Sequence, residues 1–458
     1  MSKWSLWTSQ STTNPTESPI DQPHQQQPDA AKSNVSSSPT PSINKPQDPN
    51  ISNNIVLPSI EESLNKPPIY YNFIPSLLIP SNSLYIKSKP TVFKRVLIIG
   101  VHGFFPNKMI RPLIGAPTGT SMKFTQVAEM AIQNWSLENN MKVEIQKIAL
   151  EKEGKILNRV DFFFEILKNS IDDIKKADFI FVCSHSQGCP VSIILMNKLI
   201  EFGLVNTNLQ RISILGMAGI NIGPFYGMDK SLFMRAYSTI ENDSLMELFK
   251  FQNFESLQSR KLLESLKKLV INDVKIILVG SIDDQLVPLY SALASHIQHP
   301  NIFKAVYIDT SSNTPSFLSR ILKLSCILIN NGYSDHDFIK EISTPLAGPI
   351  TGGGHSRIYN DSKVYKLALD FSLKTYSSSN AINQSLKFKP FDITKLGNNS
   401  NPFILPWCTR GLFFEVIKKL PNGRNEIDNV FNEFNQWNPQ SKILKNVKYR
   451  LNGIKAKL

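Results

Sequence analysis

The stretch Ser184-His185-Ser186-Gln187-Gly188 constrains the fold more than any other part of this chain. An apolar segment, residues 179–183, precedes it, and a second apolar segment, residues 191–200, follows it. This order predicts a buried strand, a tight turn with Ser186 at its centre, and then a helix. Strands that alternate with helices in this way are typical of a mostly parallel sheet.

The turn resembles a nucleophile elbow, Gly-x-Ser-x-Gly, with Ser184 in place of the first glycine. A strained turn of this kind raises the central hydroxyl above the sheet, and the helix N-terminus behind it favours negative charge. The crowded first position needs a small residue, and serine is nearly small enough. The motif therefore predicts that Ser186 is a covalent nucleophile. The alternative is that Ser186 only caps a helix, since Ser and Gly are common at such turns.

Apolar runs alternate with helical patterns from about residue 92 onward. The run at residues 96–101 is nearly continuous, as expected of a central strand covered on both faces. Further strands are predicted at residues 143–149, 179–183, 212–216, 274–279 and 302–308. We therefore expect an α/β fold with right-handed crossovers between parallel strands.

Composition divides the chain into three parts. Residues 1–55 are rich in Ser, Pro, Gln and Asn, so they are predicted to form a disordered, low-complexity tail. Residues 56–400 are predicted to form the α/β domain, with a helical lid inserted at about 221–270, above the carboxyl edge of the sheet. Ordinary extra helices are the alternative to a lid. Residues 401–458 are predicted to be a basic C-terminal extension.

The chain carries a net charge of +13. No zinc spacing, ribonucleoprotein motif or basic helix-turn-helix accompanies this charge, so we expect no nucleic acid as partner. An anionic membrane surface or anionic lipid matches it better. Residues 444–458 place apolar side chains at three- and four-residue steps among lysines and arginines. That pattern predicts either a helix at a membrane interface or a terminal helix packed on the domain.

The four cysteines show no metal-ligand spacing and no disulfide framework, which favours a reducing compartment. The N-terminal residues lack the pattern of a secretory signal peptide. No apolar run approaches the 18 residues of a membrane span. We therefore expect a cytoplasmic protein, in peripheral contact with a membrane if it binds one.

A nucleophilic serine needs a base that takes its proton and a carboxylate that orients the base. Asp284 follows the predicted strand 274–279 within an Asp-Gln-Leu-Val-Pro pattern and is the predicted acid. Asp283 is the alternative acid, and the sequence does not separate the two. A further alternative is that this position only caps the helical segment that follows.

His355 is the predicted base, because it lies in the glycine-rich segment 352–356, downstream of the acid. Glycines allow the backbone to bring the imidazole over the sheet. His336 is the competing base, although its acidic neighbours favour a solvated turn. Two backbone amides, of Gln187 after the nucleophile and of Phe104 in His102-Gly103-Phe104, are predicted to form the oxyanion hole.

His-Gly-Phe, His-Ser-Gln-Gly, Asp-Gln-Leu-Val-Pro and Gly-Gly-His occur in the expected order between about residues 95 and 375. In these motifs the chain resembles the α/β-hydrolase superfamily, and within it the lipase-like serine hydrolases. Its Asn-rich, low-complexity style looks like that of a fungal protein, which suggests a fungal-type branch of the superfamily. The resemblance implies a three-layer fold and ester, thioester or amide chemistry on an acyl group.

We therefore expect a serine hydrolase that cleaves an acyl ester, in particular of a lipid. Ser186 attacks, His355 transfers the proton, Asp284 orients His355, and the amides of Phe104 and Gln187 hold the oxyanion. Water then hydrolyses the acyl-enzyme, so neither a metal nor an organic cofactor is expected. The alternatives are a catalytically inactive binding or scaffold protein of the same fold, and an acyltransferase.

Overall fold

The computed structural model describes residues 53–64, 84–87, 89–104, 121–230, 243–349, 352–377, 384–396 and 401–455. The predicted tail lies outside the described residues except for residues 53–55. Residues 231–242 of the predicted lid also lie outside the described residues.

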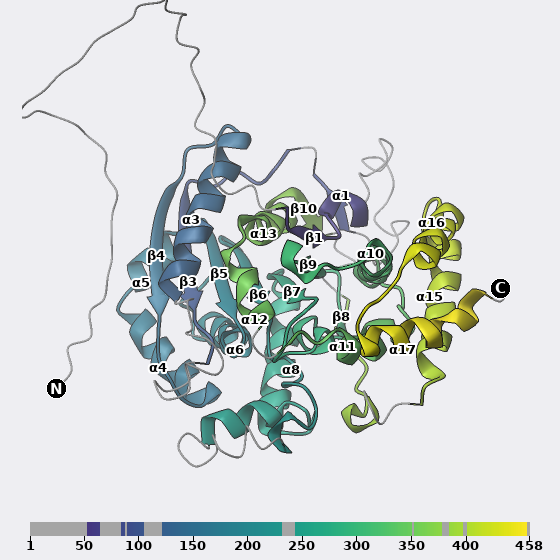
Figure 1. The fold of residues 1–458 in the computed structure, drawn as a ribbon. Helices are drawn as coiled ribbons and strands as arrows, with labels where there is room; N and C mark the ends of the chain where they lie inside the picture. The colour runs from purple at the N-terminus through teal and green to yellow at the C-terminus, as the bar shows by residue number, and fades with distance from the viewer. Residues whose placement is uncertain are drawn as a thin grey trace, which may run out of the picture.

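A seven-stranded sheet forms the middle layer (Figure 1). Its strands lie in the order β1 (Ile55–Leu57), β9 (Ile302–Ile308), β7 (Lys275–Ser281), β6 (Arg211–Met217), β5 (Phe179–His185), β3 (Arg95–Val101) and β4 (Glu144–Leu150). Every neighbouring pair is parallel except β1 with β9. The predicted mostly parallel α/β fold is thus confirmed. The short strands β2 (Leu84–Ile86) and β10 (Thr375–Ser377) pair with each other, as do β8 (Ile297–Gln298) and β11 (Lys387–Phe388).

Helices cover both faces of the sheet, which explains why its central strands are apolar on both sides. One face packs on α4 (Ile156–Lys168), α6 (Gly188–Glu201) and α8 (Leu257–Ile271). The other face packs on α3 (Ser121–Glu138) and α13 (Ser362–Lys374). Shorter helices are α1 (Ile60–Ser63), α5 (Ile171–Lys176), α9 (Leu289–Ala292) and α12 (Gly354–Arg357).

The segment predicted as a lid contains α8, whose residues Leu262, Leu266 and Leu269 are buried in the same core as α6. The sequence of α8 is amphipathic, and Ser256 caps its N-terminus by accepting a hydrogen bond from the Ser259 amide. This part of the segment is therefore a helix of the outer layer between β6 and β7. For the rest of the segment, the lid stays a prediction.

A third apolar cluster lies beyond β9. It joins α10 (Ser316–Asn330), α11 (Phe338–Leu346), α15 (Ile404–Lys419), α16 (Gly423–Gln436) and α17 (Lys442–Leu451). Val447, Leu451 and Ile454 of the C-terminal pattern are buried in this cluster. Of the two interpretations of residues 444–458, the structure favours the terminal helix packed on the domain. In this conformation Val447, Leu451 and Ile454 are not available to a membrane.

Candidate active site

Ser186 lies in a strained turn between β5 and α6. Its φ angle of 54° is in the left-handed region, which is costly for a residue with a Cβ. The Ser186 amide donates to the Met217 carbonyl of β6 at 2.9 Å, which helps to hold this conformation. Because α6 begins at Gly188, directly after the turn, the chain has the strand, turn and helix that the motif predicts.

Small residues around the turn allow close packing. A Cβ at Gly188 would lie 2.5 Å from the Val101 carbonyl oxygen, so only glycine lets α6 begin against the end of β3. Ser184, which replaces the first glycine of the motif, is fully buried. Its hydroxyl donates to the Leu215 carbonyl (3.1 Å) and accepts from the Ser192 hydroxyl (2.9 Å). The structure therefore accommodates this departure from the motif without an unsatisfied polar group.

The predicted acid and base meet at the carboxyl edge of the sheet. His355 Nδ1 lies 2.7 Å from Asp284 Oδ2, and both side chains are buried. The second oxygen, Asp284 Oδ1, accepts from the amides of Leu286 (2.8 Å) and Val287 (2.9 Å). One carboxylate thus caps the turn after β7 and also binds the imidazole. Its orientation is fixed by the backbone.

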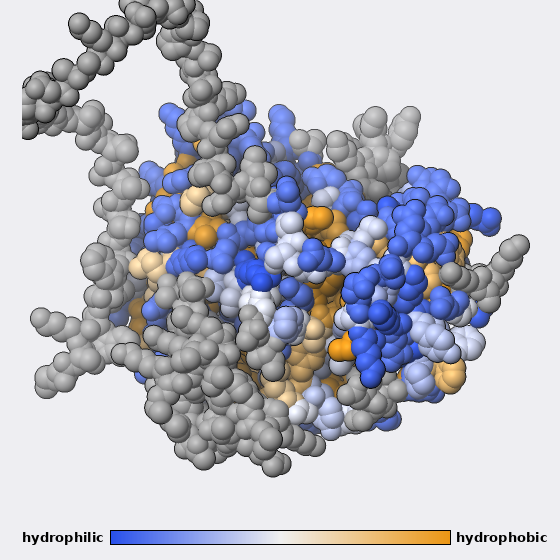
Figure 2. All heavy atoms as spheres, in the orientation of Figure 1, coloured by the Kyte–Doolittle hydropathy of each residue, from blue (hydrophilic) through white to orange (hydrophobic). Residues whose placement is uncertain are grey.

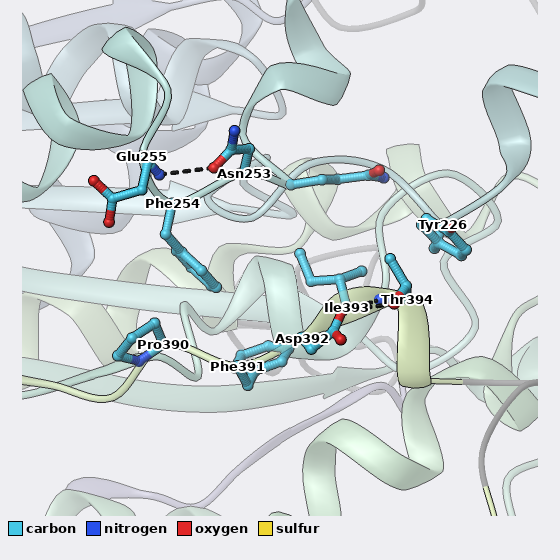
Figure 3. A pocket seen from close by; sticks show the side chains of 10 residues that line it. Tyr226, Asn253, Phe254, Glu255, Pro390, Phe391, Asp392, Ile393 and Thr394 are labelled. Carbon is cyan, nitrogen blue, oxygen red and sulfur yellow. Dashed lines mark hydrogen bonds between the residues drawn. The ribbon is translucent and has the colours of Figure 1, made fainter.

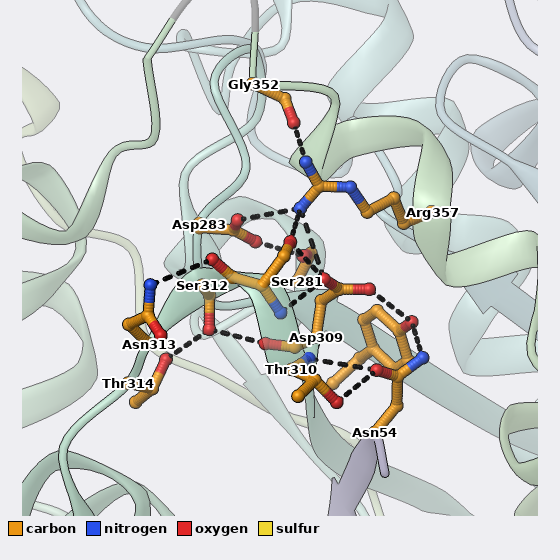
Figure 4. A network of polar contacts seen from close by, with 12 residues as sticks. Asn54, Ser281, Asp283, Asp309, Thr310, Ser312, Asn313, Thr314, Gly352 and Arg357 are labelled. Carbon is orange, nitrogen blue, oxygen red and sulfur yellow. Dashed lines mark hydrogen bonds and ion pairs between the residues drawn. The ribbon is translucent and has the colours of Figure 1, made fainter. Parts of the chain in front are cut away.

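Asp283 has a different set of contacts (Figure 4). It accepts from the Ser281 hydroxyl (3.0 Å) and lies 3.5 Å from Arg357 Nη1, which also approaches Asp309 at 3.3 Å. The other guanidinium nitrogen of Arg357 donates to the Gly352 carbonyl. Because Gly352 and Arg357 flank His355, this network anchors the loop that carries the imidazole.

Burial raises the pKa of Asp283, against the opposing effects of the Ser281 hydrogen bond and the Arg357 charge.

The backbone of Asp283 explains why the loop that carries His355 contains a glycine at position 354. A Cβ at Gly354 would lie 2.2 Å from the Asp283 carbonyl oxygen. Glycine at position 354 is therefore required for the loop to pass this close to the turn after β7.

His185 connects the serine turn to the histidine loop. Its Nε2 donates to the His355 carbonyl at 2.7 Å, and the two rings are 4.5 Å apart between centroids. Burial, and secondarily the nearby His355, lower the pKa of His185 well below its usual value, so it is neutral at pH 7. His185 therefore acts as a brace that brings Ser186 and His355 to the same edge of the sheet.

The predicted oxyanion loop packs directly on the serine turn. A Cβ at Gly103 would lie 3.0 Å from the Cβ of Ser186, so the two segments touch there. His102 Nε2 accepts from the Lys152 amide at 2.7 Å. Burial, followed by the Arg159 charge, lowers the pKa of His102 to about 3. His102 is thus a neutral residue that holds the loop.

Arg159 of α4 is fully buried beneath both predicted oxyanion residues. It donates to Gln187 Oε1 (2.6 Å), to the His102 carbonyl (2.7 Å) and, at 3.5 Å, to the Gly103 carbonyl. Within the described residues no carboxylate forms an ion pair with it. Burial lowers its pKa to about 9, so it carries its charge at pH 7. Sequence motifs do not point to this residue, because α4 is distant from each of them in the chain.

His336 and a surface cavity lie away from the predicted site residues. His336, the competing base, packs against α15 with its Nε2 3.7 Å from Glu415. A cavity of about 360 Å³ is lined by Tyr226, residues 252–255 and residues 390–394, with Phe254 and Phe391 in edge-to-face contact (Figure 3). None of the predicted site residues lines it. In the described part of the chain no group of three or more His, Cys, Asp or Glu side chains could hold a metal ion.

Comparison with known proteins identifies the family. The family model described as the YMC0/YMC35 alpha/beta hydrolase domain matches residues 72–416. This match confirms the resemblance to the α/β-hydrolase superfamily. No curated protein matches the chain significantly.

Solved structures show more distant similarity. Phospholipase PlaB from Legionella pneumophila has 12% identity and a TM-score of 0.30, over 44% of this chain and 45% of PlaB. The chain thus matches less than half the length of that protein. Est1E from Butyrivibrio proteoclasticus has 12% identity and a TM-score of 0.29, over 49% of this chain and 82% of Est1E. A structure described under the metagenome-derived lipolytic enzymes LipS and LipT has 11% identity and a TM-score of 0.28. The match covers 51% of this chain and 91% of the chain in that structure. Similarity this low says nothing about activity or substrate.

Proposed function

Because the chain belongs to the YMC0/YMC35 alpha/beta-hydrolase family, we propose that it is a serine hydrolase that cleaves an acyl ester of a lipid. The observation that carries this proposal is the 2.7 Å contact between His355 and Asp284. The loop that carries His355 also contacts the turn of Ser186 through His185. These contacts support a Ser-His-Asp arrangement of the kind that nucleophilic catalysis by serine uses.

In this mechanism, Asp284 accepts a hydrogen bond from the Nδ1–H group of His355, which leaves the Nε2 lone pair as the base. His355 takes the Ser186 proton as the serine oxygen attacks the carbonyl carbon of the ester. It then gives that proton to the departing alcohol, and the acyl group stays on Ser186. Water, deprotonated by His355, attacks the acyl-enzyme, releases the acid and restores the serine.

The negative oxygen of the tetrahedral intermediate accepts hydrogen bonds from the amides of Phe104 and Gln187 in this proposal. Arg159 positions both donors. Its guanidinium donates to the carbonyls of His102 and Gly103 and to the side chain of Gln187. The Gly103 carbonyl and the Phe104 amide belong to one planar peptide group, so holding the carbonyl also orients the amide. A buried charge without a carboxylate is costly. Its place beneath the site supports a role in stabilising the charge that develops there.

The choice of a lipid ester rests on the basic charge of the chain and on the predicted lid. We propose a cytoplasmic location because all four cysteines are unpaired and buried. No helix in the described ranges is long and apolar enough to cross a membrane.

Replacement of Ser186 by Ala should abolish the hydrolysis of a short p-nitrophenyl ester. We expect kcat/KM to fall by at least about 10³-fold, because the nucleophile is lost while the oxyanion donors remain. Ser184→Gly is the matched control, since it restores the motif glycine two residues away and should keep the rate within a few fold. A Ser186→Ala protein that hydrolyses the ester at the wild-type rate would contradict the mechanism.

The two adjacent aspartates should differ sharply in the same assay. Asp284→Asn should lower kcat by about 10⁴-fold, because an amide in this position favours the wrong imidazole tautomer. Asp283→Asn weakens only the contact with Arg357, so we expect a loss of less than tenfold and a lower thermal midpoint. If Asp283→Asn gave the larger loss in kcat, the assignment of the acid would be wrong.

Substitution of Arg159 separates positioning from folding. Arg159→Met should lower kcat by about 10²-fold with little change in KM, the loss expected for one oxyanion donor. Arg159→Lys keeps the charge but cannot bridge all three acceptors, so it should recover part of kcat. Thermal unfolding of both variants is the control for structure. An unchanged kcat in folded Arg159→Met, or no difference between the Met and Lys variants, would contradict this role.

A further inference from the structure

Helix α15 has an inner face that is fully used in packing. Its buried residues are Leu405, Cys408, Thr409, Leu412, Phe413 and Val416. They belong to the apolar cluster shared with α10, α11, α16 and α17. A helix that buries one face in this way normally presents polar residues on the other.

The outer face of α15 is apolar instead. Phe403 and Trp407 are each 69% exposed, and Phe414 is 55% exposed. Spacings of four and seven residues place these aromatic side chains along one side of the helix. Ile404 and Ile417 extend the same surface and are each 36% exposed. A contiguous exposed apolar surface of this kind marks an interaction site, whereas single exposed apolar residues do not.

Cations accompany the aromatic rings on this face. The Arg410 guanidinium lies 5.6 Å from the centre of the Trp407 ring, and Lys418 Nζ lies 5.4 Å from that of Phe414. Arg450 of α17 donates to the carbonyl of Pro402, so it adds a cation beside the start of α15. In Figure 2, orange patches lie among blue surface on the side of the molecule where Figure 1 shows α15–α17.

Acidic side chains are scarce around this face. Glu415 is the one acidic residue of α15; it is 20% exposed and faces His336 of the loop before α11. Helix α17 contains no acidic residue. Glu426 and Glu433 of α16 are held by Arg320 of α10. On α15 and α17 basic side chains therefore outnumber acidic ones.

We propose that the outer face of α15 docks on an anionic membrane surface. Aromatic side chains favour the boundary between headgroups and acyl chains, and Lys and Arg are attracted to anionic lipid. An aromatic surface bordered by cations fits both requirements, and the net charge of +13 acts in the same direction. This surface is distinct from the buried side chains of Val447, Leu451 and Ile454. The proposal does not depend on the chemistry of Ser186.

Binding of the full-length chain to vesicles tests the proposal. Wild-type protein should sediment with vesicles of phosphatidylcholine and phosphatidylserine, and much less with phosphatidylcholine alone. The double variant Phe403→Ala/Trp407→Ala should bind about tenfold more weakly, because it loses apolar area. Arg410→Gln should weaken binding about fivefold, and high salt should remove this difference.

The matched control is Leu137→Ala/Leu209→Ala, which removes two side chains that are 74% and 80% exposed elsewhere on the molecule. This variant should bind vesicles like the wild type. All variants should hydrolyse a soluble short ester at the same rate, so that failure of docking is distinct from failure of the active site.

Two results would overturn the proposal. One is vesicle binding that is absent in the wild type or equal in the wild type and the Phe403/Trp407 variant. The other is wild-type protein that forms a dimer, measured by light scattering, which the Phe403/Trp407 variant loses. That result would assign the face to a second copy of the chain.

Discussion

The hydrogen bond between His355 and Asp284 depends on three chain segments that meet at the carboxyl edge of the sheet. The turn after β7 fixes the carboxylate through two backbone amides, and Arg357 ties the histidine loop to that turn. His185, at the end of β5, holds the same loop by its carbonyl. Because parallel strands end at one edge, side chains that are 170 residues apart in the sequence become neighbours.

Close backbone contacts make this convergence possible. Gly103, Gly188 and Gly354 each lie where a Cβ would press on the backbone or the Cβ of another site segment. Arg159 adds a second layer of support beneath Gln187 and the predicted oxyanion loop. The neutral histidines His102 and His185 hold their loops without adding charge to the site. The protein therefore builds the site from buried supports, and only a few groups remain for chemistry.

Much of this arrangement could be predicted from the sequence. The strands are continuous apolar runs, and the elbow, the Asp-Gln-Leu-Val-Pro turn and the Gly-Gly-His loop are local patterns. Arg159, Arg357 and the bracing role of His185 could not be predicted, because each acts through partners that are distant in the sequence. The two adjacent aspartates have the same local sequence context, so only the structure shows which one binds His355.

For the C-terminal helix, the sequence pattern predicts the helix but not the partner of its apolar face. An apolar stripe among lysines is compatible with a membrane or with a protein core, and the sequence does not say which lies opposite. The structure buries Val447 and Leu451 against the domain and leaves Phe403 and Trp407 of α15 exposed. The surface that we propose for membrane contact therefore lies on a neighbouring helix, whose outer aromatic residues sequence analysis did not single out.

Labelling with a fluorophosphonate, followed by intact mass measurement and peptide mapping, tests whether Ser186 is an activated nucleophile. The reagent requires an activated serine but no knowledge of the substrate. We expect a single adduct on Ser186, which His355→Ala slows strongly in protein shown to be folded. An adduct on another residue would contradict the assignment of Ser186, and a folded wild-type protein that forms no adduct would favour a scaffold of the same fold.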